Sequence, residues 1–193
     1  MKVWPPRLQS CRGFTLTELV VIVAIIGIMT AVAIPNYLDW NRKYKLKDAV
    51  GLIHATANMA RMNAINQNAT ATVTVAQASS SSRVTVSIIG VSGVEGLTLD
   101  SEVSLTNANS DTVGGGTPAV LSSQSVQFNS MGMRVSGSGL CIASSGSYTG
   151  SACTSSDRQA FNFKNTRSPA DNYRIVVLPT GKISWCYVST CAG

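Results

Sequence analysis

Residues 12–35 read RGFTLTELVVIVAIIGIMTAVAIP, and this stretch decides how the chain is organised. The 16 residues from Leu19 to Ile34 carry no charge, and Glu18 directly precedes them. The run is at the short end of the roughly 20 residues that a helix needs to cross a bilayer. A carboxylate costs about 2.5–3.5 kcal/mol at the bilayer centre and less near the surface. Glu18 is therefore a candidate functional residue that needs a partner for its charge.

The residues around this run match a known pattern, the N-terminus of type IV prepilins and type II secretion pseudopilins, which the segment closely resembles. The matching positions are Gly13, Phe14, Thr15, Leu16, Glu18, the apolar run and Pro35. The resemblance implies that a prepilin peptidase cleaves after Gly13 and that Phe14 is then N-methylated. It also implies that Glu18 pairs with the terminal amine of a neighbouring subunit during assembly, within a helix that contains Pro35.

Two features depart from the family pattern: Thr17 replaces the usual aliphatic residue, and the leader of residues 1–13 is long. Two other interpretations of the segment remain. A secretory signal peptide would use the basic residues of the leader and the apolar run, and a plain transmembrane anchor would use the run alone. Neither interpretation accounts for Glu18 within the segment or for Gly13-Phe14 ahead of it.

The resemblance also sets the expected organisation and location. Residues 1–13 are the leader, residues 14–41 the transmembrane and filament-core half of a helix, and residues 42–193 a periplasmic globular domain. The precursor would be a single-pass protein of the bacterial inner membrane, and the mature subunit would join a periplasmic or cell-surface filament. The expected partners are prepilin peptidase, other pilins or pseudopilins, and an inner-membrane platform.

The composition is typical of an exported β-rich protein rather than of a cytosolic enzyme. Only 12% of the 193 residues are charged, and Ser, Thr, Gly and Asn are abundant beyond Asn68. A chain of this length can bury the core of one domain. The net charge of +6 falls to +3 when Lys2, Arg7 and Arg12 leave with the leader. This modest positive charge does not by itself imply that the protein binds nucleic acid.

Five cysteines are present, and Cys11 lies in the leader. The other four form an even set in a region expected to be periplasmic, where disulfides form. They are Cys141, Cys153, Cys186 and Cys191. Of the three pairings that they allow, proximity in the sequence favours Cys141–Cys153 and Cys186–Cys191. Zinc is the rival use of four cysteines, but no histidine lies near them, and no metal site is predicted.

Helical periodicity continues beyond Pro35. Apolar residues recur at alternating steps of four and three, which places them on one helix face. They are Leu46, Val50, Ile53, Ala57, Ala60 and Ala64. We expect a helix from Phe14 to about Asn68, kinked or loosened at Pro35, whose second half packs on the globular domain.

Beyond Asn68 the pattern changes to alternating or short apolar runs, which predict strands. The predicted strands are Thr72–Val75, Val84–Val91, Ser125–Phe128, Leu140–Ala143, Gln159–Phe163, Tyr173–Leu178 and Lys182–Val188. Pro179-Thr180-Gly181 predicts a hairpin turn, and Ser144–Ser156 predicts a polar loop. The predicted fold class is α+β, with a long N-terminal helix packed on an antiparallel sheet as in the pilin fold.

No residue pattern predicts an enzyme active site, and no cofactor is expected. His54 is the single histidine, and we expect it on the helix surface or at the boundary between helix and sheet. No serine lies in a nucleophile-elbow pattern, and Gly114–Gly116 lack the lysine of a phosphate-binding loop. The scattered acidic residues lack the spacing of an EF-hand calcium site. They are Glu95, Asp100, Glu102 and Asp111.

Three stretches resemble the GspH/FimT-type minor pilins and pseudopilins. They are Ala60–Ile65, in which Asn63 replaces the group's common Glu, together with Val126–Gly132 and Ile175–Cys186. The resemblance implies a minor subunit that supports filament assembly, in either a type IV pilus or a type II secretion pseudopilus. We expect Arg61 to satisfy carbonyls at the end of the sheet or a nearby acid.

Some FimT-type proteins bind DNA during natural transformation through arginines in a C-terminal loop. Between Met131 and Gly193 this chain has six basic residues and two acidic ones. Arg158, Lys164 and Arg167 could contact phosphates from such a loop, giving sequence-independent and salt-sensitive binding. A solvated basic surface is the alternative interpretation.

Overall fold

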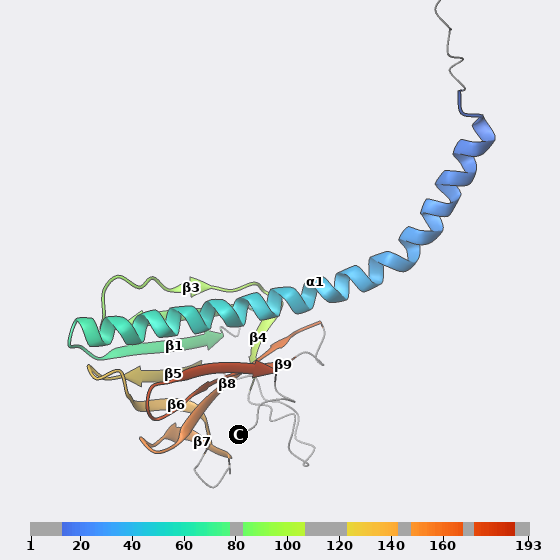
Figure 1. Cartoon of the computed structure of the whole chain (residues 1–193). Coiled ribbons are helices and arrows are strands. Elements are labelled where there is room, and N and C mark those ends of the chain that lie inside the picture. The colour runs from blue at the N-terminus through green and yellow to red at the C-terminus, as the bar shows by residue number, and fades with distance from the viewer. Residues whose placement is uncertain (1–12, 78–82, 107–122, 143–147, 168–171, 188–193) are drawn as a thin grey trace, which may run out of the picture. The chain divides into compact units, whose positions relative to one another are not determined.

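The computed structural model describes residues 13–77, 83–106, 123–142, 148–167 and 172–187 (Figure 1). The chain divides into two compact units, with the boundary between Asp39 and Trp40. The first unit contains the start of the helix α1, and the second contains the rest of α1 and every described strand.

The long helix α1 (Leu16–Asn66, 51 residues) ends within two residues of the predicted limits on both sides and includes Pro35. Its C-terminus has a clear physical cause. Asn68 adopts a positive φ of 48°, which asparagine tolerates better than most residues. The Ala69 amide donates to the Ala64 carbonyl at 3.0 Å, and the Asn68 amide donates to the Ile65 carbonyl at 3.2 Å. These two bonds form a Schellman motif, which closes the helix.

The predicted apolar stripe forms one side of the hydrophobic core. All of its members are buried, with at most 5% of each residue exposed: Leu46, Val50, Ile53, Ala57, Ala60 and Ala64. They belong to one cluster with sheet residues that include Val73, Phe128 and Phe163. Small alanines near the end of the stripe allow the sheet to approach the helix closely. The second half of α1 therefore packs on the sheet as predicted.

The strands are β1 (Ala71–Gln77), β2 (Val84–Ile89), β3 (Leu97–Thr98), β4 (Val103–Thr106), β5 (Ser123–Phe128), β6 (Arg134–Ile142), β7 (Tyr148–Cys153), β8 (Arg158–Asn165), β9 (Asn172–Val177) and β10 (Ile183–Tyr187). Their order in the sheet is β10-β9-β8-β6-β5-β1-β2-β3, with β4 paired to β8 and β7 paired to β6. Every described pairing is antiparallel. Figure 1 shows the sheet against the second half of α1. The α+β prediction is confirmed.

Each predicted strand overlaps an observed one, but the sequence pattern missed β3, β4, β7 and the first part of β6. The prediction of Ser144–Ser156 as a loop is wrong for Tyr148–Cys153, because this segment forms β7. Its partner strand is β6, over the register from Gly137 to Ile142. Both strands are rich in Gly and Ser here. Backbone hydrogen bonding can build such a ladder without the apolar alternation by which sequence analysis detects strands.

A disulfide joins Cys141 in β6 to Cys153 at the end of β7, with Cα atoms 5.2 Å apart. This is one of the two pairs that sequence proximity favoured. Cys186 lies in β10, whereas Cys191 is outside the described residues, so the second pairing stays a prediction. For a closed loop of about 15 residues, a disulfide contributes about 3 kcal/mol in the chain-entropy account.

Arg61 links two turns at one end of the sheet. Its Nε donates to the Gly132 carbonyl at 2.7 Å, and its Nη2 donates to the Thr180 carbonyl at 3.4 Å. Gly132 lies between β5 and β6, and Thr180 lies in the predicted hairpin between β9 and β10. In that hairpin the Gly181 amide donates to the Leu178 carbonyl at 2.9 Å. The expectation that Arg61 satisfies sheet-end carbonyls is confirmed.

His54 lies at the boundary between helix and sheet, as expected. Its Nε2 is 3.2 Å from the Ile183 carbonyl oxygen, and the same nitrogen is 3.2 Å from Nδ2 of Asn58 one helical turn away. The histidine therefore has a structural role in joining α1 to β10.

Replacement of Arg61 by methionine should destabilise the domain. The Arg61→Met variant removes the donor for two turn carbonyls, so we expect the free energy of unfolding to fall by about 1–3 kcal/mol. Urea unfolding of the full chain in detergent, followed by circular dichroism, measures this change. Met62→Lys is a matched control, because Met62 is 60% exposed and surface changes stay within about 0.5 kcal/mol. Equal stability of the two variants would contradict this role for Arg61.

Candidate functional site at the start of the long helix

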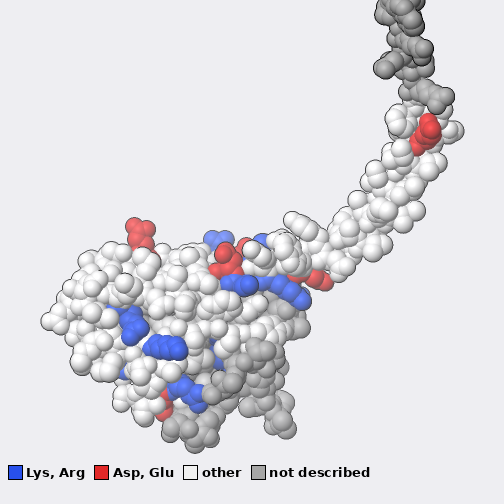
Figure 2. Space-filling view, viewed as in Figure 1, with Lys and Arg blue, Asp and Glu red and all other residues white. Residues whose placement is uncertain are grey.

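The first half of α1 presents apolar side chains to its surroundings on every side. Between Leu19 and Ile34 the large apolar side chains are 47–70% exposed. We call residues 14–34 the apolar rod. Figure 2 shows this part of the helix as an uncharged surface with one acidic side chain close to its start. By length and composition, α1 is the one helix among the described residues that could cross a membrane.

Apolar side chains exposed on this scale must be buried by something other than the described residues. Burying apolar surface yields about 25 cal/mol per Å², and a folded soluble protein seldom leaves a continuous apolar surface in water. A helix also satisfies its own backbone hydrogen bonds, so it can lie in hydrocarbon or against other helices without unpaired groups. The rod is suited to lipid and to helical bundles alike.

Thr15 and Glu18 form a capping box at the helix start. The Thr15 amide donates to Glu18 Oε2 at 2.8 Å, and the Thr15 hydroxyl donates to the same oxygen at 2.9 Å. In return, the Glu18 amide donates to Thr15 Oγ1 at 3.3 Å. This reciprocal arrangement satisfies amides that have no partner within the helix, and it places a negative charge at the positive end of the helix dipole.

Thr17, which departs from the family pattern, joins this polar cluster. Its hydroxyl oxygen lies 3.0 Å from that of Thr15. The first turn of the helix therefore has three polar side chains, Thr15, Thr17 and Glu18, directly ahead of the uncharged run. The substitution leaves the carboxylate and its cap in place.

The expected cleavage position lies just outside the helix. Gly13 and Phe14 precede Leu16, where α1 begins, and they have no regular secondary structure. Phe14 is 80% exposed, and nothing lies within 4 Å of a Cβ built on Gly13. An exposed peptide without helical hydrogen bonds suits a peptidase substrate. The structure itself does not test cleavage, so Gly13 and Phe14 keep their roles as predictions.

The structure does not bring the predicted DNA-binding residues together in one loop. Arg158 and Lys164 are near opposite ends of β8, about 20 Å apart at roughly 3.3 Å per residue. Arg167 follows the strand, and its Nε lies 3.5 Å from Glu102 Oε1. The expected loop is partly strand, because Lys164 and Asn165 belong to β8.

Glu102 and its neighbour Asp100 form an ion-pair network with Lys45 and Arg167. Lys45 Nζ, on α1, lies 3.3 Å from Asp100 Oδ2 and 3.8 Å from Glu102 Oε2. The Glu102 amide donates to Asp100 Oδ1 at 3.0 Å. This hydrogen bond, helped by Lys45, lowers the pKa of the Asp100 carboxyl from its usual value. The network fixes the segment before β4 on the helix, and it occupies Arg167.

Two other basic residues of the C-terminal region are buried and structural. Arg134 is 2% exposed, and its Nη2 donates to the carbonyls of Thr154 and Asp157. Burial lowers the pKa of Arg134, although nearby Asp157 opposes this effect. Arg174 is 3% exposed and donates through Nε to Asn162 Oδ1 at 2.8 Å. Neither guanidinium is available to a phosphate at the surface.

Within the described residues, no group of three or more His, Cys, Asp or Glu side chains could hold a metal ion. Asp111, one of the acids considered for calcium, is outside those residues. The lysines and arginines visible in Figure 2 are spread over the domain, and several of them lie beside acidic side chains. Of the polar clusters among the described residues, the Thr15–Glu18 cap is the one that lies directly ahead of the apolar rod.

Comparisons with known proteins also point to the N-terminal segment of the chain. The prokaryotic N-terminal methylation motif matches residues 8–34. A fimbrial protein of Pseudomonas aeruginosa is 42% identical over 53 residues, which are 28% of this chain and 34% of that protein. The type IV major pilin protein PilA of Myxococcus xanthus is 53% identical over 38 residues, 20% of this chain and 17% of PilA. PilE1 of Neisseria gonorrhoeae, a type IV major pilin protein, is 44% identical over 39 residues, 20% of this chain and 24% of PilE1.

No solved structure matched the chain. The motif and these relatives show that the N-terminal segment of this chain is similar to that of type IV pilins, and the chain combines it with an exposed apolar helix and an antiparallel sheet. Each match covers about a third or less of the relative's length. What the whole chain does, and with which partners, is therefore a matter for proposal.

The role of Thr15 as a helix cap could have been read from the sequence but was missed. The spacing Thr15-x-x-Glu18 directly before an apolar run is the signature of a capping box. Family resemblance drew attention to the carboxylate alone. The capping-box spacing shows that Thr15 and Glu18 act together at the helix start.

Loss of the cap should loosen the first helical turn. Thr15→Ala removes the N-cap hydroxyl, which costs about 1 kcal/mol and should speed amide exchange at Glu18 and Leu19 about fivefold. Hydrogen exchange of the precursor in detergent micelles, read by NMR, measures this. Thr15→Asn is the matched control, since asparagine caps equally well. Unchanged exchange in Thr15→Ala would show that the cap does not form in solution.

Proposed function

We propose that this chain is a minor type IV pilin of the FimT/GspH kind, which is processed by prepilin peptidase and built into a pilus or pseudopilus, where it supports filament assembly. The observation that carries the proposal is the apolar rod, exposed on every side, with the capped Glu18 at its start. None of the described residues buries these side chains, so the function of the rod lies in what covers it.

The proposed mechanism is physical rather than catalytic. In the precursor, residues 14–41 span the inner membrane and residues 42–193 form the periplasmic domain. Prepilin peptidase cuts after Gly13, and Phe14 becomes the methylated N-terminus. Assembly at an inner-membrane platform then transfers the rod from lipid to a bundle with other pilins. Because α1 keeps its own backbone hydrogen bonds, this transfer needs no unfolding.

Glu18 would set the register of this bundle. The uncharged run that follows it offers no partner for a carboxylate, and a charge in an apolar bundle is stable only when paired. In the family pattern that partner is the terminal amine of a neighbouring subunit. The capping box keeps the carboxylate hydrogen-bonded before the partner arrives. Before assembly, Glu18 therefore stays in the membrane at a low free-energy cost. It still favours the position in the bundle at which a neighbouring subunit supplies a cation.

The contacts of Arg61 support the assignment to the FimT/GspH group. The three stretches that resemble this group are far apart in the sequence, yet they meet at this side chain. Arg61 lies in the first stretch, Gly132 ends the second, and Thr180 is in the third. A resemblance whose parts converge on one set of hydrogen bonds is more informative than three separate short matches.

Two substitutions separate processing from assembly. Gly13→Ala should leave nearly all of the protein as uncut precursor in membranes, because the residue before the cleaved bond is changed. Glu18→Ala should be cut normally but should enter filaments poorly, because its carboxylate is lost. Immunoblots of membrane and sheared-filament fractions measure both effects.

Thr17→Ile, which introduces an aliphatic residue as is usual in the family, is the control and should behave as the wild type in both fractions. Mass spectrometry of the mature wild-type chain should find N-methylated Phe14 as its first residue. A different first residue, or normal incorporation of Glu18→Ala, would refute the roles proposed for this segment.

DNA binding during natural transformation is a second candidate, which the excess of basic residues in the C-terminal region favours. Its weakness is that Arg167 already faces Glu102, while Arg158 and Lys164 are separated along β8. A type II secretion pseudopilin differs only in the machine that uses the subunit. Deletion of the gene followed by assays of piliation, transformation and protein secretion distinguishes the three.

A gel-shift titration of residues 42–193 over a salt series tests DNA binding directly. We expect no retardation at 150 mM salt, roughly physiological ionic strength. If the fragment does bind, and if Arg158→Gln or Arg167→Gln weakens binding while Lys182→Gln does not, DNA capture would replace the structural proposal. Phosphate contacts would also make that binding fall steeply with salt.

A further inference from the structure

A pocket of about 360 Å³ lies at one end of the sheet, where three turns come together. The turns are those between β5 and β6, between β7 and β8, and between β9 and β10. The pocket is separate from the apolar rod and from the cap at the start of α1, and nothing in the proposed function uses it. The residues that line it are Asn129, Met133, Arg134, Val135, Ser155, Pro179 and Thr180.

Backbone hydrogen bonds hold the walls of this pocket in place. The Asn129 amide donates to the Met133 carbonyl at 2.9 Å, which closes the turn between β5 and β6. The Arg134 amide donates to the Pro179 carbonyl at 3.1 Å, which joins this turn to the one between β9 and β10. The pocket therefore forms together with the fold of the domain.

Arg134 is a buried cation in this pocket, and part of its guanidinium is unpaired. The residue is 2% exposed, and its Nη2 donates to the carbonyls of Thr154 and Asp157. Nε and Nη1 are also buried, but they have no hydrogen-bond partner among the described residues. Buried polar groups in folded proteins are nearly always hydrogen-bonded, and an unpaired donor on a charged group is especially costly. Two donor groups of a cation are therefore left for a ligand.

A nearby acid does not pair with this cation directly. Asp157 lies close enough for its charge to favour the charged form of Arg134. Its Oδ2, however, accepts hydrogen bonds from the amide and the hydroxyl of Thr154, at 2.8 and 2.7 Å. Arg134 forms no ion pair within the described part of the chain. The guanidinium thus keeps most of its capacity to pair with an anion.

We propose that this pocket binds a carboxylate, which comes either from a glutamate side chain in a polypeptide or from a small free carboxylic acid. The carboxylate oxygens would accept hydrogen bonds from Arg134, because a carboxylate matches a guanidinium in both charge and shape. The aliphatic part of the ligand would contact Val135 and Pro179. The inference does not depend on a role in filaments, because the whole pocket lies within one chain.

Polar side chains of the wall can complete the hydrogen bonds of a carboxylate. Asn129 Oδ1 accepts from the amides of Met131 and Met133, at 3.1 and 2.9 Å. Because the amide oxygen is used in this way, the nitrogen Nδ2 is the group that Asn129 can offer to a ligand as a donor. Ser155 and Thr180 are exposed, and each adds a hydroxyl group.

The apolar part of the wall favours a carboxylate over a phosphate. The side chains of Met133, Val135 and Pro179 donate no hydrogen bonds. A phosphate carries up to two negative charges, so it would lose more hydration energy against such a wall than a carboxylate does. One arginine balances the single charge of a carboxylate.

Access to the guanidinium requires the movement of a wall side chain, because Nε and Nη1 are fully buried. Met133 lines the same pocket and is 41% exposed. A methionine side chain is unbranched and adapts its conformation easily. Rotation of Met133 would let a slender carboxylate reach Arg134, whereas a phosphate within a DNA backbone is too bulky to follow.

NMR of arginine side chains tests the pocket in the full chain, purified in nonionic detergent. The Nε–H signal of Arg134 is identified by its loss in Arg134→Lys. The probes are a blocked tripeptide with a central glutamate, the same tripeptide with glutamine, butyrate and inorganic phosphate. The proposal predicts a saturable shift of this signal, with the glutamate tripeptide bound about tenfold more tightly than the glutamine tripeptide, since only the former supplies a charge.

The other probes separate the sources of the carboxylate. Butyrate that binds as tightly as the glutamate tripeptide, or more tightly, identifies free carboxylic acids as ligands, and weaker binding of butyrate identifies a polypeptide. No saturable shift with either carboxylate would overturn the proposal. So would binding of the glutamine tripeptide or of phosphate that equals or exceeds that of the carboxylates.

Ser155 provides a matched pair of variants that does not require Arg134→Lys to fold. Ser155 is exposed in the turn between β7 and β8 and lines the pocket. Ser155→Glu places a carboxylate at the pocket and should weaken binding of the glutamate tripeptide by about tenfold, because like charges repel or compete for Arg134. Ser155→Gln has the same size and should bind the tripeptide as the wild type does. Equal binding by the two variants would show that the ligand lies elsewhere.

Discussion

The physical constraint on which this protein depends is an apolar helix whose side chains the described residues leave exposed. From Leu19 to Ile34 the rod has no charge, and its large side chains stay about half exposed or more. The second unit does not depend on the rod, because its core is closed by the sheet and the stripe from Leu46 to Ala64. The second unit therefore has a core of its own, whereas the rod is suited to lipid or to contact with other helices.

The capping box shows how the single carboxylate of this segment can be tolerated in both surroundings. A helix start leaves amides without partners, and hydrocarbon makes each of them costly. Thr15 and Glu18 satisfy two of those amides with each other's side chains. The carboxylate keeps hydrogen-bonded neighbours whether or not a cation from another subunit is present. A later pairing with an amine would add to this arrangement rather than create it.

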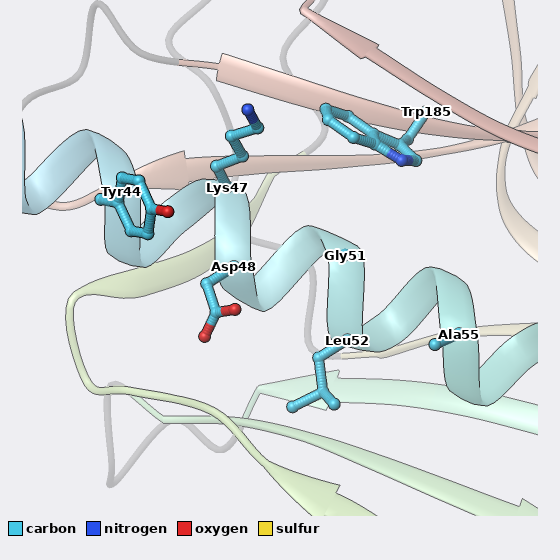
Figure 3. A pocket seen from close by; sticks show the side chains of 7 residues that line it. All are labelled: Tyr44, Lys47, Asp48, Gly51, Leu52, Ala55 and Trp185. Carbon is cyan, nitrogen blue, oxygen red and sulfur yellow. The ribbon is translucent and has the colours of Figure 1, made fainter.

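Periodic burial explains what could be predicted from sequence and what could not. The helix limits and the stripe from Leu46 to Ala64 follow from 3.6-residue periodicity, and Arg61 follows from its place at the helix end. Strand β7 was missed because Tyr148–Cys153 is held by backbone pairing and the Cys141–Cys153 disulfide, which leave no apolar alternation. A groove between α1 and β10, lined by residues that include Gly51, Leu52 and Trp185 (Figure 3), could not be predicted either, because Trp185 reaches it from a strand more than 130 residues away.

The second half of α1 has two faces, and its residues meet different requirements on each. Leu46, Val50 and Ile53 must fit the sheet, so their sizes are set by the packed interior. Gly51 and Ala55 lie on the other side, where the chain's own fold requires nothing of them. Glycine in the middle of a helix costs about 1 kcal/mol relative to alanine, and no contact within the described structure compensates for it. Gly51 weakens its own helix and leaves this part of the helix surface open, so the outer face of α1 is not shaped by the packing of the core.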